Sequence, residues 1–303
     1  MLSHLKLLLL LLPLLLPGLA AVSAERNDAK NRSDHVIPLI DIQAWTAWTG
    51  DNALTESNEE ARRKVAKLVG KACEESGFFA IKNHGVNDTI MNAMWQATKD
   101  FFDLPVSEKM NSKTNNETEY PYGYENSETL VAGKRMDEKS LDDNEDVHVS
   151  APPADLKETF SMGPKNPLAG MPPRRYPQNP PIMKDALDLY YQEMENLANL
   201  LLRIFAIALD LPDENWFDDK MDRHMSALRI LNYFEIQSSD REPGQLRAGA
   251  HTDYGALTIL KSGGPGLQVM SGAKWVDVPY LPDENTFVIN IADLMSRWTN
   301  GKS

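Results

Sequence analysis

The stretch that decides the fold runs from residue 244 to residue 260 and reads GQLRAGAHTDYGALTIL. It joins an apolar, β-prone end to a histidine and a carboxylate two positions apart, His251 and Asp253. Side chains alternate along a strand with a period of two, so residues two apart project from the same face. Both side chains can therefore bind one metal ion.

The sequence around this stretch favours further strands. We expect strands at 227–234, 250–261, 266–270, 275–278 and 286–291, with turns supplied by GGPG from residue 263 and SGAK from residue 271. Many short strands in series, without helices between them, indicate an antiparallel sandwich or a jelly roll.

The N-terminal half mixes helices with strands. The pattern predicts a strand over 36–42, a helix that opens with a capping box at Ser57, a strand over 78–84 and an amphipathic helix that ends at Pro105. Residues 111–181 are too irregular for an ordinary connection and indicate a lid, short strands or mobile segments, and a long amphipathic helix opens at Pro180. The fold class is therefore mostly β with flanking helices (α+β).

The composition excludes one class of partner. A net charge of −13 argues against binding to nucleic acid, because the chain has no basic stripe to neutralise phosphates. The acidic run at 137–146 is expected to be a solvated loop. Cys73 is the single cysteine, and its apolar helical setting predicts a buried structural thiol.

The first 24 residues have the pattern of a signal peptide. Lys6 supplies a positive charge, residues 7–16 are apolar, and the small residues at 22–24 form a cleavage site. We therefore expect residues 1–24 to lie outside the fold, a secretory or extracellular location, and no stable membrane span after leader removal. Retention as an anchor is less favoured, since a span needs about 20 apolar residues.

A histidine and an acid two positions apart are a weak signal alone, because the chain has six histidines. The position of the pair in a jelly-roll-like region strengthens it. Non-haem Fe(II) is bound by two histidines and one carboxylate, which requires a pair of this kind and one distant histidine. A metal site is therefore favoured over a purely structural pair.

Several motifs, in the correct order, resemble the Fe(II)- and 2-oxoglutarate-dependent dioxygenases of the isopenicillin N synthase-like family. In the C-terminal half they are LRAGAHTDYG from residue 246, GLQV from 266, WVDVP from 275 and FVINIADLM from 287. In the N-terminal half they are IPLID from residue 37, ACEESGFF from 72, NHG from 83 and FFDLP from 101. The resemblance covers most of the chain from residue 36 onward.

This resemblance implies a domain organisation and a set of ligands. Residues 36–160 would form the non-haem dioxygenase N-terminal region, and residues 180–303 the jelly-roll (double-stranded β-helix) domain. The family binds Fe(II), uses 2-oxoglutarate as co-substrate and consumes O2, with His251 and Asp253 as iron ligands and no further catalytic residue among those matched. Tyr233 matches the family tyrosine that hydrogen-bonds the 2-oxoglutarate carboxylate, although a buried strand tyrosine is an equally good reading. His84, in NHG, matches a position away from the iron and is expected to be structural.

The sequence departs from the family at the C-terminus. In the family, a stretch like residues 297–301 leads within several residues to a second iron-binding histidine and then to an Arg-x-Ser strand whose arginine pairs with 2-oxoglutarate, and the sequence up to Ser303 contains neither. We therefore expect a jelly roll that is incomplete (truncated) at the C-terminus, weak iron binding and impaired turnover, which leaves open whether this chain is an active enzyme.

The resulting hypothesis is the oxidation of a small-molecule substrate, by hydroxylation or desaturation, with oxidase chemistry also open. The alternative is a catalytically inactive dioxygenase-like binding module. A metal-binding cupin of other chemistry is a third reading, against which the NHG block counts.

Overall fold

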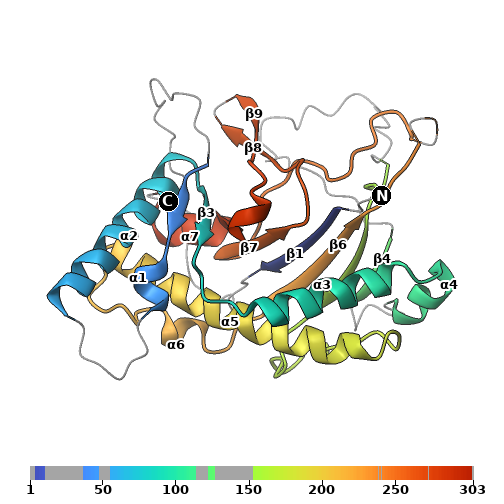
Figure 1. Ribbon diagram of the computed structural model, residues 1–303, viewed down its shortest axis with the longest axis horizontal. Helices are drawn as coiled ribbons and strands as arrows, with labels where there is room; N and C mark the ends of the chain where they lie inside the picture. Colours follow the sequence, from blue (N-terminus) through green and yellow to red (C-terminus); the bar gives the residue numbers. More distant parts are fainter. Residues whose placement is uncertain are drawn as a thin grey trace, which may run out of the picture.

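The protein is described here from a computed structural model, which covers residues 4–10, 37–47, 55–113, 122–126 and 153–301, apart from 238, 240 and 272. Its centre is an eight-stranded sheet with the order β2-β3-β10-β7-β1-β6-β5-β4 (Figure 1). The neighbouring strands are antiparallel except for the parallel pair β2 and β3. The strands are β1 (His4–Leu10), β2 (Leu39–Asp41), β3 (Phe78–Lys82), β4 (Gly123–Glu125), β5 (Glu158–Met162), β6 (Ala227–Tyr233), β7 (Leu257–Ser262) and β10 (Phe287–Ile291).

One face of this sheet is mostly apolar and covered by helices, and we call it the helix-covered face. Figure 1 shows α2 (Glu56–Glu75), α3 (Asp88–Phe102) and α5 (Ile182–Ala208) on that side. The ring of Phe79 meets Phe205 of α5 edge-on at 6.4 Å, and Phe160 meets Phe101 of α3 at 5.4 Å. Burial of these alternating apolar side chains is the main stabilising contribution, at about 25 cal/mol per Å².

The opposite face carries more polar side chains, and we call it the site face. The strand registers place Thr258, Asn290 and Arg229 on it, since each alternates with a residue that packs against the helices. A separate two-stranded sheet of β8 (Gln268–Ser271) and β9 (Lys274–Asp277) lies on this side in Figure 1.

The remaining elements are short and connect the sheet to the helices. They are α1 (Gln43–Thr46), α4 (Val106–Lys109), η1 (Met110–Ser112), α6 (Asp218–Met221), η3 (Pro282–Glu284) and α7 (Asp293–Trp298). The predicted combination of an antiparallel core with flanking helices is therefore confirmed.

Residues 4–10 lie inside the sheet, so the expectation that all of residues 1–24 lie outside the fold is wrong for this segment. His4–Leu10 form β1, which pairs with β6 on one side and with β7 on the other. The physical reason is that β6 and β7 do not pair with each other, and their facing N–H and C=O groups need partners. Whether the leader is cleaved stays a prediction.

Two predicted boundaries are also wrong. The strand expected at 250–261 begins at Leu257, and α2 is capped by Thr55, whose hydroxyl accepts a hydrogen bond from the backbone N–H of Asn58. The long irregular segment contains the short strands β4 and β5, and the acidic run at 137–146 lies outside the described residues.

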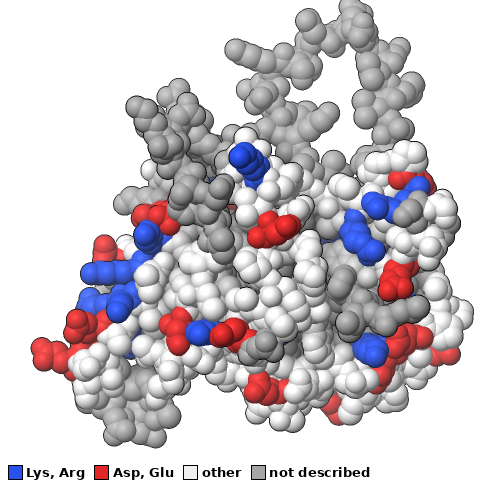
Figure 2. Space-filling model, turned by 45° about the horizontal axis from the view of Figure 1, so that its top comes forward, with Lys and Arg blue, Asp and Glu red and all other residues white. Residues whose placement is uncertain are grey.

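Cys73 is buried on α2, and burial raises the pKa of its thiol to about 12, as expected for a structural cysteine. Within the described ranges, no helix is both long and apolar enough to cross a membrane. On the face shown in Figure 2, the Lys and Arg side chains of the described residues lie among Asp and Glu side chains.

Candidate functional site

The candidate metal site lies in the loop that leads into β7. His251 and Asp253 precede the first residue of the strand, Leu257, so strand alternation does not place them. The start of α7 positions the loop instead. The backbone N–H of Asp293 donates to the carbonyl of Asp253 at 2.9 Å, and that of Leu294 donates to the carbonyl of Gly255 at 3.1 Å.

The carboxylate of Asp253 is oriented through one of its two oxygens. Its Oδ2 accepts hydrogen bonds from the hydroxyl of Thr258 at 2.6 Å and from the side-chain amide of Asn290 at 3.0 Å. Both donors come from neighbouring strands, β7 and β10, whose register sets Thr258 opposite Asn290. The other oxygen, Oδ1, is thereby directed toward His251.

The imidazole of His251 is oriented in the same manner. Its Nδ1 lies 2.9 Å from the carbonyl oxygen of Gly249, which can only accept, so Nδ1 carries the proton. The Nε2 atom lies 3.6 Å from Oδ1 of Asp253, and in the neutral ring it carries the lone pair that can bind a metal. In metal-binding histidines, one ring nitrogen usually donates to a backbone carbonyl or a similar acceptor, and the other ring nitrogen binds the metal.

These two donors fit one divalent metal ion. Metal bonds to imidazole nitrogen and carboxylate oxygen are about 2.1 Å long, so donors 3.6 Å apart can both contact the same ion. The side chain of His251 is 38% exposed and that of Asp253 is 11% exposed, which leaves an open approach for further ligands. Within the described part of the chain, no third His, Cys, Asp or Glu joins the pair.

The other histidines of the described region have different surroundings. His84 is buried, its Nε2 donates to the carbonyl of Asn285 at 2.7 Å, and its Nδ1 accepts from the backbone N–H of Val86 at 3.1 Å. Burial lowers the pKa of its imidazole, so the ring is neutral. His224 lies 3.1 Å from the carboxylate of Glu195, and His148 lies outside the described residues. The structural role predicted for His84 agrees with both of its hydrogen bonds.

Tyr233 lies on the site face but at the far end of the sheet from Asp253. Tyr233 pairs with His4 of β1, whereas Thr258, which holds the Asp253 carboxylate, pairs with Leu10. Six residues of strand separate these two positions, which is roughly 20 Å. The structure therefore does not bring Tyr233 together with the metal pair, and its assignment to 2-oxoglutarate stays a prediction.

Sequence reasoning missed the residues that support the pair. Thr258 and Asn290 are polar positions within apolar strand segments, LTILKS and FVINI, and that pattern was a usable signal. Asp293 begins α7, and its carboxylate accepts from the hydroxyl of Thr252 at 3.0 Å.

Comparison with known proteins shows the family of the chain. Residues 225–303 match the family profile described as the 2OG-Fe(II) oxygenase superfamily, and residues 37–182 match the N-terminal profile of non-haem dioxygenase in morphine synthesis. The chain is 31% identical over 280 residues to the 2-oxoglutarate-dependent dioxygenase tropC of Talaromyces stipitatus, covering 88% of this chain and 79% of that protein. It is 28% identical to the homoarginine-6-hydroxylase 2-ODD-C23 of Glycine max, covering 88% of this chain and 77% of that one.

Solved structures give the same result. A full-length Neurospora crassa protein, crystallised in complex with alpha-KG and thymine, is similar with a TM-score of 0.70 and 27% identity, over 90% of this chain and 78% of that chain. A protein from Caulobacter crescentus, described as a member of the 2OG-Fe(II) oxygenase family, is similar in fold. Its TM-score is 0.67 and its identity 23%, over 88% of this chain and 77% of that one.

Proposed function

Because the chain belongs to the Fe(II)- and 2-oxoglutarate-dependent oxygenases, we propose that His251 and Asp253 are its iron ligands and that it oxidises a small organic molecule by hydroxylation or desaturation. Fe(II) is the cofactor of this family and 2-oxoglutarate the co-substrate. When bound, they supply the activation of O2 that the protein side chains cannot provide. The observation that carries the assignment is the distance of 3.6 Å between His251 Nε2 and Oδ1 of Asp253.

The work of the protein side chains at this site is to orient donors. Gly249 fixes the His251 tautomer, and Thr258 and Asn290 fix one oxygen of Asp253, so that the other oxygen and Nε2 converge.

A small-molecule substrate is supported by the solved relatives. One of them is described in complex with thymine, which is a small planar molecule. The identity of the substrate of this chain depends on loops that vary within one fold, so the proposal extends to the class of substrate alone.

The test is an anaerobic titration of the apoprotein with Fe(II) in the presence of 2-oxoglutarate, followed through the visible charge-transfer absorption of the bound pair. We expect His251→Ala and Asp253→Ala each to abolish the absorption. His224→Ala is the matched control, because His224 is a partly exposed histidine beside Glu195 and outside the site.

The outcomes separate clearly. If the His224→Ala chain keeps the absorption and the two ligand variants lose it, the assignment is supported. An absorption that survives in both ligand variants would show that the iron is bound elsewhere. Thermal unfolding of each variant shows whether lost absorption reflects lost folding.

A further inference from the structure

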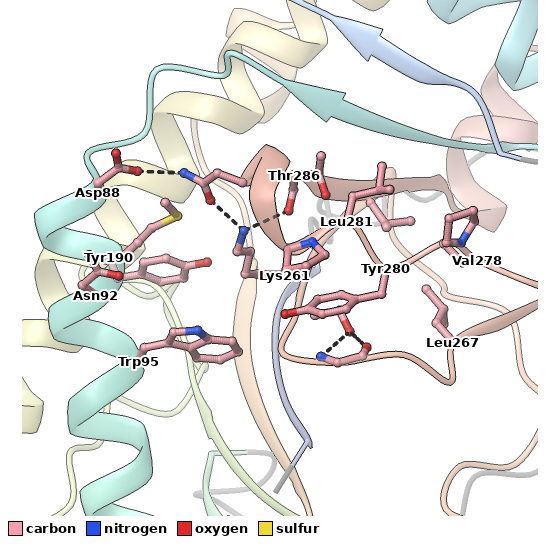
Figure 3. Close-up of a pocket in the computed structure, with 17 residues that line it drawn as sticks. Asp88, Asn92, Trp95, Tyr190, Lys261, Leu267, Val278, Tyr280, Leu281 and Thr286 are labelled. Atoms are coloured by element: carbon pink, nitrogen blue, oxygen red, sulfur yellow. Dashed lines mark hydrogen bonds between the residues drawn. The ribbon is translucent and has the colours of Figure 1, made fainter. Parts of the chain in front are cut away.

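A cavity lies away from the metal pair, between α3, the end of β7 and the segment 278–288 (Figure 3). Its volume is about 320 Å³, which is within the usual range of small-molecule pockets. Lys261 is the positively charged residue of the cavity and points to the helix-covered face, whereas Thr258 of the metal site points to the site face. Three residues of strand, roughly 10 Å, also separate these two positions. The cavity is therefore distinct from the metal site.

The charge in this cavity is the ammonium group of Lys261, which forms no ion pair within the described part of the chain, although Asp88 acts on it electrostatically. The Nζ of Lys261 donates to the side-chain oxygen of Asn285 at 2.7 Å and to the carbonyl of Thr286 at 3.1 Å. Asp88 is the acid in the cavity wall, but its carboxylate accepts from the amide of Asn285 at 2.7 Å. An ammonium group has three donors, and these two bonds use two of them. One donor is thus available to an anion.

A buried hydroxyl group gives a second, independent sign of a ligand. Tyr190 is 1% exposed and lines the cavity, and its hydroxyl has no hydrogen-bond partner among the described residues. A buried polar group without a partner is destabilising by about 1–3 kcal/mol, so native structures rarely leave one. Figure 3 shows this hydroxyl directed toward the part of the cavity where Lys261 lies. An oxygen atom of a ligand placed between them would accept from both groups.

The walls of the cavity favour a flat apolar body. Figure 3 shows Trp95 and Tyr190 on the helix side and Tyr280 on the opposite side, with Leu267 nearby. Aromatic walls bind planar groups well, and one or two polar groups then fix the orientation.

We propose that this cavity binds a small aromatic monocarboxylate, with its carboxylate at Lys261 and the Tyr190 hydroxyl and its ring between Trp95 and Tyr280. The cation supplies charge, the phenol supplies a hydrogen bond, and the aromatic walls supply apolar contact. The proposal is independent of the iron chemistry, because none of these residues belongs to the metal pair.

The test uses benzoate as the probe and benzamide as its uncharged counterpart, titrated into the metal-free full-length chain by calorimetry. We expect benzoate to bind with a dissociation constant of about 1 mM or lower, at least about tenfold more tightly than benzamide. Lys261→Met should weaken benzoate at least about tenfold and remove its advantage over benzamide. Tyr190→Phe, which removes only the hydroxyl, should weaken benzoate by roughly threefold to tenfold.

Two controls complete the experiment. Lys67→Met removes an exposed lysine of α2 and should leave benzoate affinity unchanged, and His251→Ala should also leave it unchanged. The proposal is overturned if benzoate and benzamide bind equally, if Lys261→Met binds benzoate as the unmodified chain does, if His251→Ala abolishes binding, or if no binding is seen. Tyr190→Phe serves as the folded variant if Lys261→Met fails to fold.

Discussion

The hydroxyl of Thr258 donates to Oδ2 of Asp253 across 2.6 Å, and this bond connects the first strand after the metal loop to the carboxylate that would bind iron. Asn290, opposite Thr258 in the neighbouring strand, donates to the same oxygen at 3.0 Å. The sheet register therefore decides the orientation of a loop residue. Removing either donor should release the carboxylate without touching the ligand itself.

We predict that Thr258→Val lowers the affinity for Fe(II) by about tenfold to a hundredfold, because valine keeps the shape and loses the hydrogen bond. The anaerobic titration with 2-oxoglutarate measures this change. Thr252→Val is the matched comparison, since that hydroxyl donates to Asp293 rather than to a metal ligand. Equal affinities for the two variants would contradict the orienting role of Thr258.

His84→Ala should destabilise the protein and leave iron affinity unchanged. The substitution removes the bond to the Asn285 carbonyl and the edge-on contact with Phe287, whose ring centre lies 4.6 Å away. A loss of about 2–4 kcal/mol in the free energy of unfolding is expected and is measured by urea denaturation. A folded His84→Ala chain with strongly reduced iron binding would assign His84 to the metal site instead.

The sequence predicted that His251 and Asp253 lie close together, and the reason for that prediction was only partly correct. His251 and Asp253 do converge, but the bond that His251 donates to the Gly249 carbonyl and the bonds that Asp253 accepts from Thr258 and α7 bring them together, and strand alternation does not. Spacing along the chain indicates which neighbouring side chains can lie close together. It does not indicate hydrogen-bond partners that are distant in sequence, such as Asn290, which lies 37 positions from Asp253.

Removing residues 1–24 should destabilise the chain, because β1 pairs with strands on both sides. The backbone N–H and C=O groups of β6 and β7 that pair with β1 would lose their partners. The free energy of unfolding should fall by at least about 3 kcal/mol and the melting temperature by roughly 6–12 °C. Leu8→Pro in the full-length chain is a milder test of the same pairing, since proline removes one ladder donor. An unchanged melting temperature for both chains would contradict a structural role for β1.

The N-terminal segment also shows where composition alone is ambiguous. A run of leucines after Lys6 satisfies the pattern of a leader, and the same run can extend as a strand between two others. Local pattern cannot distinguish these outcomes, because the second depends on a gap between β6 and β7 that exists only in the folded sheet. By contrast, the helices that cover the sheet were predictable, since their apolar spacing is a local property.

Lys261 should make stability depend on pH above neutrality. Burial lowers the pKa of its ammonium group from 10.5 to about 8, while the unfolded chain keeps the ordinary value. Between these values the unfolded state binds more protons, so this group makes the free energy of unfolding rise with pH.

Three other ionisable groups lie near Lys261. Asp88 raises the pKa of Lys261 and so opposes the effect of burial, burial lowers the pKa of the His84 imidazole, and burial raises the pKa of the Tyr190 hydroxyl. Urea denaturation at several pH values between about 7.5 and 10.5 measures the rise, which Lys261→Met should abolish and Lys67→Met should keep. A rise that persists in Lys261→Met would assign it to another group.

The central claim is that His251 and Asp253 bind the iron, and X-ray absorption at the iron edge of the Fe(II)- and 2-oxoglutarate-loaded protein tests it most directly. The account predicts an imidazole contribution to the scattering that decreases in His251→Ala and is unchanged in His224→Ala. An imidazole contribution that is the same in His251→Ala as in the unmodified chain would contradict it.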